Sequence, residues 1–190
     1  MLNRKMDKKI SGMTLIETLV VFSVGLVVIA LALTVYRSVS NKMNVKNETE
    51  NLSIMFTQTM DLFSEETTKD LSTALAIEAG IIPDKMKIVG ATVKNTWGGA
   101  VTIAGGGGAV GAEGDILVVY DRVPTGNTCI DLVRNQRKVG WTNYEIGGAT
   151  GDGEGGQYSA MKTAELTTSC KGAAGKDTIQ LSFKYKSTEG

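Results

Sequence analysis

KKISGMTLIETLVVFSVGLVVIALALTVY, residues 8–36, decides the fold of this 190-residue chain. A short basic start gives way to a mostly apolar run of 18 residues, Leu19–Tyr36, which no proline interrupts. As an α-helix this run would be about 27 Å long, at ~1.5 Å per residue, and would cross most of the hydrocarbon core of a bilayer. We therefore predict a membrane-inserting helix near the N-terminus.

The basic residues are unevenly distributed along the chain. Residues 1–12 carry a net charge of +3, whereas the whole chain is neutral, because Asp7 alone opposes Arg4, Lys5, Lys8 and Lys9. A basic segment directly before an apolar run is typical of a targeting sequence. The neutral overall balance gives no indication of a surface for nucleic acid.

The composition argues against an enzyme. Histidine is absent, which removes the commonest general base and the commonest metal ligand. Two cysteines are too few for a cysteine-rich zinc site. No nucleophile or carboxylate pair stands out by its spacing. We predict a non-enzymatic structural protein that uses no metal and no cofactor.

The helix is expected to continue beyond the membrane segment, because neither glycine nor proline occurs between Arg37 and Asp70. Asn44–Asn51 is polar and a weaker helix former. Apolar side chains then recur at helical spacing: Leu52, Met55, Phe56, Met60 and Phe63. We predict one helix over Thr14–Ser64, capped by Thr14 or Ser11, apolar all round in its first half and amphipathic in its second.

The rest of the chain predicts shorter elements. A second helix fits Lys69–Ala79, and one or two helical turns fit Cys129–Arg134. Short β-like runs follow the pattern expected of strands, at Lys87–Val89, Ala100–Ala104, Ile116–Tyr120 and Ile179–Tyr185. The predicted fold class is therefore α+β, with the amphipathic half of the long helix packed on a sheet.

The junction between the basic leader and the apolar run resembles the processing site of the type IV prepilins. The leader ends in Gly12, Met13 follows, and Glu17 is the fifth residue beyond the glycine. In that family a peptidase cuts before the apolar segment, and the new first residue is N-methylated. The resemblance implies cleavage after Gly12, methylation of Met13 and a helix packed on an antiparallel sheet.

The resemblance also implies a domain organisation and a route. Residues 1–12 would be the leader, residues 13–37 the helix of the membrane and of the filament core, and residues 38–190 the globular pilin domain. The precursor would sit in the bacterial inner membrane and then enter an extracellular pilus as its major subunit. The implied partners are prepilin peptidase, the pilus assembly platform, minor pilins and further copies of this chain in a helical filament.

Glu17 has a specific role in this interpretation. A carboxylate at the edge of a membrane helix is costly unless it finds a partner. In the family, the terminal amine of a neighbouring subunit neutralises this glutamate, and the pair sets the axial register of assembly. The resemblance therefore implies that Glu17 is an assembly determinant whose partner is the amine of Met13.

Two further features fit the type IVb pilins of the thin-pilus and bundle-forming branches. Residues 81–103 and Tyr120–Val133 resemble segments of those proteins, and Met13 as the first mature residue fits the same branch.

An even number of cysteines in an exported domain predicts one disulfide. Type IV pilins usually close a C-terminal region with a disulfide, and the resemblance implies that Cys129 and Cys170 form this bond here.

Other interpretations remain open at the level of sequence. Ala30-Leu31-Ala32 matches the cleavage site of an ordinary signal peptide, and the apolar run could be an uncleaved anchor. Within the same machinery, the chain could be a minor pilin or a type II secretion pseudopilin, although pseudopilins usually lack the disulfide. A membrane-anchored adhesin that never polymerises is a further alternative, and it would tolerate replacement of Glu17.

Overall fold

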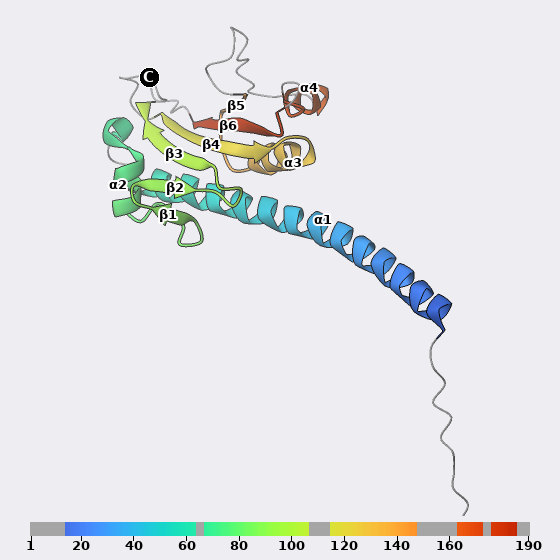
Figure 1. Ribbon diagram of the computed structural model, residues 1–190. Coiled ribbons are helices and arrows are strands. Elements are labelled where there is room, and N and C mark those ends of the chain that lie inside the picture. Colours follow the sequence, from blue (N-terminus) through green and yellow to red (C-terminus); the bar gives the residue numbers. More distant parts are fainter. Residues whose placement is uncertain (1–13, 64–66, 107–114, 148–162, 173–175, 186–190) are drawn as a thin grey trace, which may run out of the picture. The chain divides into compact units, whose positions relative to one another are not determined.

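The computed structural model describes residues 14–63, 67–106, 115–147, 163–172 and 176–185. These residues form a long helix, a six-stranded antiparallel sheet and several short helices, which confirms the predicted α+β class (Figure 1). The chain divides into two compact units, one ending at Ser40 and the other beginning at Asn41. The second unit contains the sheet and the whole hydrophobic core.

Helix α1 extends over 48 residues, from Leu15 to Leu62, close to the predicted bounds. Thr14 caps its start, because the backbone N–H of Glu17 donates to the Thr14 hydroxyl at 3.4 Å. Ser11, the alternative cap, and Ser64, the predicted end, lie outside the described residues. The polar stretch Asn44–Asn51 is helical throughout, like the apolar segments on either side of it.

The second part of α1 packs on the sheet, as predicted. Leu52 and Met55 are fully buried in the core, and Phe56 and Met60 are partly buried against it. Burial of such apolar side chains contributes roughly 1.5–3 kcal/mol each. The amphipathic half of α1 therefore supplies one wall of the domain.

The sheet is antiparallel throughout, in the order β1-β2-β3-β4-β6-β5. Its strands are β1 (Lys87–Val89), β2 (Thr92–Lys94), β3 (Ala100–Gly105), β4 (Ile116–Pro124), β5 (Asn143–Ile146) and β6 (Thr178–Tyr185). The long central strand β4 pairs with β3 and β6, and its register with β6 shifts between Tyr120 and Val123. A β-bulge therefore interrupts the middle of the sheet.

Aromatic rings fill the core between α1 and the sheet. The ring of Phe183 on β6 lies 6.3 Å from Tyr120 and 5.8 Å from Tyr144, in edge-on contacts. Phe56 of α1 meets Trp141 at 4.7 Å. On β6, Leu181 and Phe183 are buried in the core, while Ile179 and Tyr185 are only partly buried against it.

The single helix predicted over Lys69–Ala79 is wrong, because this segment is divided. It forms a 3₁₀ turn, η1 (Thr68–Asp70), and then helix α2 (Thr73–Glu78). Leu71 between them is extended, and its carbonyl accepts from the N–H of Gly105 at 2.9 Å. This bond to the end of β3 holds Leu71 outside the helical region. The remaining helices are α3 (Asn127–Gln136) and α4 (Thr163–Ser169).

Candidate functional site

The start of α1 carries the first part of the candidate site. Glu17 is the one charged side chain between Leu15 and Tyr36, and it is exposed in the first helical turn. A carboxylate is favoured there, because the unpaired N–H groups give a helix N-terminus a partial positive charge. Gly12 and Met13, which are predicted to flank the cleavage site, lie outside the described residues.

The surface that follows Glu17 is apolar and uncovered. The large apolar side chains from Leu15 to Val39 are 50% to 80% exposed. In the described part of the chain, α1 is the one helix that is long and apolar enough to cross a membrane. Length and composition alone would also fit a signal sequence, so the surface by itself does not separate the alternatives.

The polar side chains within this segment are satisfied by the helix itself. The hydroxyls of Thr18 and Ser23 donate to the carbonyls three residues earlier, each at 2.8 Å, and Thr34 donates to the Ala30 carbonyl at 2.9 Å. Such bonds matter because hydrocarbon offers no partner for a free hydroxyl. They leave Glu17 as the one acidic or basic side chain on the apolar segment.

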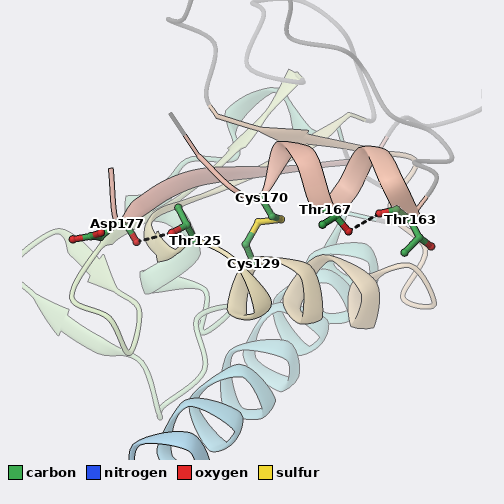
Figure 2. The surroundings of a disulfide bond; sticks show 6 residues. All are labelled: Thr125, Cys129, Thr163, Thr167, Cys170 and Asp177. Carbon is green, nitrogen blue, oxygen red and sulfur yellow. Dashed lines mark hydrogen bonds between the residues drawn. A yellow bond between two sulfur atoms is a disulfide. The ribbon is translucent and has the colours of Figure 1, made fainter. Parts of the chain in front are cut away.

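The second part of the candidate site is the disulfide of the globular domain. Cys129 on α3 and Cys170, directly after α4, are both fully buried and are joined in a disulfide, with 5.6 Å between their Cα atoms (Figure 2). Next to it, the N–H of Gly126 donates to the Cys170 carbonyl at 2.7 Å. Thr125 donates its N–H to the Asp177 carbonyl at 3.0 Å. The crosslink therefore ties α3 to the chain that leads into β6.

Two family models match this chain. Residues 7–33 match the prokaryotic N-terminal methylation motif, and residues 42–184 match the family described as PilS N terminal. The second match covers well over half of the chain. The chain belongs to the type IV pilins. No curated protein sequence matches it.

Membership decides between several of the alternatives. Type IV pilins are structural subunits and not enzymes. The methylation motif spans the Gly12 junction and implies processing by prepilin peptidase, in place of an ordinary signal cleavage after Ala32. The exposed apolar part of α1 fits insertion in a membrane and later entry into a pilus. Within the described residues of the pilin, no group of three or more His, Cys, Asp or Glu side chains could hold a metal ion.

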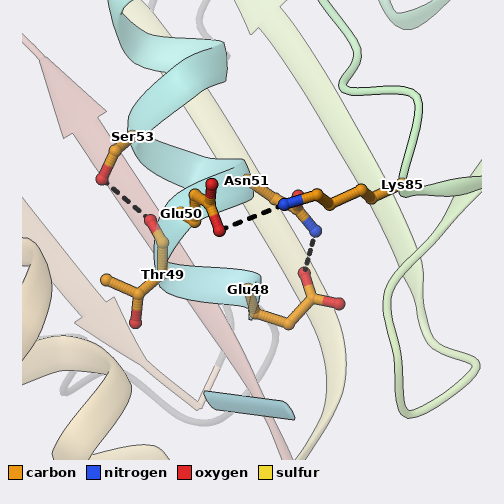
Figure 3. Close-up of polar contacts among 6 residues, drawn as sticks. All are labelled: Glu48, Thr49, Glu50, Asn51, Ser53 and Lys85. Atoms are coloured by element: carbon orange, nitrogen blue, oxygen red, sulfur yellow. Dashed lines mark hydrogen bonds and ion pairs between the residues drawn. The ribbon is translucent and has the colours of Figure 1, made fainter. Parts of the chain in front are cut away.

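Glu48 is a buried carboxylate that sequence reasoning missed. It is 1% exposed on α1 and reaches the turn between β2 and β3, where one of its oxygens accepts from the Thr96 N–H at 2.6 Å and also from the Thr96 hydroxyl. Its other oxygen lies 3.5 Å from the amide nitrogen of Asn51 (Figure 3). These contacts anchor the turn of the pilin domain to the helix.

The sequence did contain a signal for this contact. Positions 48, 52, 55 and 59 follow the helical spacing of the core face, and all four residues are buried. A glutamate on such a face needs a partner, because an isolated buried charge is very costly. The partner could not be identified from the sequence, since Thr96 lies 48 residues away.

Tyr120 lies in the same part of the core. Its hydroxyl is buried and has no hydrogen-bond partner among the described residues. Burial raises the pKa of Tyr120 well above its ordinary value of 10. The Glu48 carboxylate adds to the rise through its negative charge and through its approach to the hydroxyl, which falls short of hydrogen-bond geometry. The side chain therefore stays neutral at any physiological pH and acts as part of the core.

Proposed function

We propose that this pilin is the major structural subunit of a type IV pilus of the type IVb branch. The precursor is cleaved after Gly12 and N-methylated at Met13, and its domains are the leader 1–12, the membrane and core segment 13–37 and the globular domain 38–190. The observation that carries the proposal is the single carboxylate of Glu17, at the start of an apolar surface whose hydroxyls are already bonded.

Cleavage supplies the missing partner of Glu17. It creates an ammonium group at Met13, about one helical turn away, so a pair within one subunit can assist insertion. In the filament the same carboxylate binds the amine of a neighbouring subunit instead. Such a buried pair contributes more to register than to net stability, because desolvation offsets much of its attraction. Glu17 thereby sets the axial position of each subunit relative to its neighbour in the filament.

The remaining partners follow from this route. Prepilin peptidase processes the precursor in the inner membrane, the assembly platform extracts it, and minor pilins join it in the extracellular filament. The disulfide supports a pilin over a type II secretion pseudopilin, which usually lacks one. A minor pilin and a non-polymerising adhesin are the competing functions. The first would be scarce in purified filaments, and the second would be absent from them.

Replacement of Glu17 tests the proposal. Glu17→Ala should be inserted and cleaved normally, because insertion and cleavage depend mainly on the apolar run and on Gly12. The yield of sheared surface filaments should collapse. Glu17→Gln keeps the shape without the charge and should fail less completely. Thr18→Val is the matched control, since it removes a hydroxyl that is already bonded within the helix, and it should polymerise normally.

Two measurements separate processing from assembly. The mobility shift on loss of the leader reports cleavage, and electron microscopy of the sheared fraction reports filaments. Cleaved Glu17→Ala protein that polymerises at the normal yield would contradict the assembly role of Glu17. Filaments that contain only traces of the wild-type chain would instead identify a minor pilin.

A further inference from the structure

A polar cavity of about 580 Å³ opens on the globular domain, on the side of the sheet where β4 bulges. It lies between the β2–β3 turn, the bulge and the first residues of β6. Its lining residues are Lys94, Gly98, Ala100, Asp121, Arg122, Lys176, Thr178, Ile179 and Gln180. The volume falls within the range of small-ligand sites, roughly 300–1,000 Å³.

The cavity is positively charged. Lys94, Arg122 and Lys176 line it against the single carboxylate of Asp121. The Asp121 carboxylate is already engaged, because the amide of Gln180 donates to it at 2.6 Å. Within the described part of the chain, none of the three cations forms an ion pair. The lining therefore carries three positive side chains against one negative, a formal net charge of 3 − 1 = +2.

The β2–β3 turn and the bulge, which border the cavity, are held together by hydrogen bonds. The side-chain amide of Asn95 donates to the Asp121 carbonyl at 2.7 Å, and its oxygen accepts from the N–H groups of Trp97 and Gly99 at 3.0 and 2.9 Å. A Cβ atom at Gly99 would collide with the same Asp121 carbonyl. One asparagine thus locks the turn against the bulge, which fixes the two sides of the cavity relative to each other.

Arg122 occupies a costly backbone conformation in this cavity. Its φ angle is 55°, and it is the one non-glycine residue with positive φ among the described residues. Glycine would adopt this conformation without penalty, whereas an arginine is strained. The bulge places Arg122 in this conformation and leaves its side chain exposed at the cavity.

We propose that this cavity binds an acidic saccharide. Arg122, with Lys94 and Lys176, would hold the carboxylate or sulfate, because a guanidinium matches the geometry of an oxyanion with two parallel hydrogen bonds. Thr178 would supply a hydroxyl to the sugar, and the polar atoms of Gln180 and Asp121 that lie outside their mutual hydrogen bond would supply further donors and acceptors. The filament would then carry one anion-selective sugar site on each subunit, which goes beyond its structural role.

Binding is measured by calorimetry on the full mature chain in non-ionic detergent, so the test does not depend on filament assembly. The probes are a heparin-derived sulfated disaccharide, sialyllactose, neutral lactose and inorganic sulfate. We expect at least one acidic sugar to bind, and its affinity to fall with added salt. Arg122→Gln should weaken it by about tenfold or more. Lys138→Gln, the same charge change at an exposed site outside the cavity, should not.

Arg122→Gly separates binding from folding. It removes the strained side chain, so the melting temperature should rise by about 2–4 °C while acidic-sugar binding is lost. If Arg122 had only a structural role, its replacement by glycine would not both raise the melting temperature and abolish acidic-sugar binding. The proposal is overturned if no acidic sugar binds, if lactose or inorganic sulfate binds equally well, or if Lys138→Gln weakens binding as much as Arg122→Gln.

Discussion

Glu48 and Glu50 lie two residues apart on α1 and differ in their surroundings. Glu48 is buried and accepts from the Thr96 backbone, whereas Glu50 is exposed and pairs with Lys85 at 3.3 Å (Figure 3). We expect Glu48→Ala to lower the free energy of unfolding by about 1–3 kcal/mol, because the Thr96 N–H loses its partner. Glu50→Ala should cost less than about 1 kcal/mol, since exposed ion pairs contribute little.

Urea unfolding of the mature chain in non-ionic detergent measures both variants. The fluorescence of Trp97 and Trp141 reports the globular domain, which contains both side chains. Equal losses in the two variants would mean that the Thr96 contact does not anchor the turn. Glu48→Gln adds a test of charge, because an amide oxygen can still accept from the Thr96 N–H.

Tyr120 predicts how the domain responds to alkali. The unfolded tyrosine ionises near pH 10, but the folded one resists ionisation because its pKa is raised. Its contribution to stability is therefore complete below pH 10 and is lost as the pH rises towards the folded pKa. Tyr120→Phe should leave stability at pH 7 unchanged or slightly higher, because the hydroxyl is buried without a partner.

The Phe variant should also retain more of its stability above pH 10 than the wild type does. Chemical unfolding at pH 7 and at pH 11, followed by circular dichroism, gives both quantities. A clear loss of stability at pH 7 would show that the Tyr120 hydroxyl makes a stabilising hydrogen bond.

At the scale of elements, the disulfide is the strongest local constraint. It closes a loop with a sequence separation of 41 residues, for which chain entropy gives about 4 kcal/mol. We expect Cys129→Ser to destabilise the domain by several kcal/mol and to lower the amount of exported pilin. Immunoblots of membrane and surface fractions measure the level, and a thiol assay on denatured wild-type protein should find no free cysteine. Two free thiols would refute the bond.

The elements that were predicted correctly are those whose signal is local. The uninterrupted apolar and amphipathic pattern gave α1 nearly its full length, and regular alternation identified β6. Strands β2 and β5 were missed, because each buries a single side chain, Val93 or Tyr144, and so shows no repeated alternation. Helix α4 was missed as well, since Leu166 is its single buried residue and leaves no apolar stripe.

The residues of the candidate site also differ in whether the local sequence identifies them. Glu17 and the two cysteines stood out from composition and position, whereas the basic cavity did not. Lys94, Arg122 and Lys176 come from three separate strands or strand ends and meet through antiparallel pairing and a bulge. No sequence pattern near these residues indicates either the strand register or the bulge.

At the scale of the whole molecule, processing defines the functional chain. We expect the exported protein to begin at N-methyl-Met13, because the methylation motif spans the Gly12 junction. Intact mass spectrometry of purified filaments measures the start and the added methyl group together. A chain beginning at Leu33 would instead indicate ordinary signal cleavage, and it would lack the Glu17 carboxylate altogether.

The internally bonded hydroxyls of α1 have a thermodynamic consequence for the life cycle of the pilin. The hydroxyls of Thr18, Ser23 and Thr34 donate to carbonyls of α1 itself. The apolar part of α1 therefore presents an almost purely hydrocarbon surface, both to lipid and to other helices. Lipid acyl chains and the leucine side chains of neighbouring helices are about equally apolar, so the free energy of this surface should be similar in both environments. We expect transfer between the two to be close to balanced, so a subunit could return from the filament to the bilayer. Under the role proposed for Glu17, a modest free-energy difference at this residue would then set the direction.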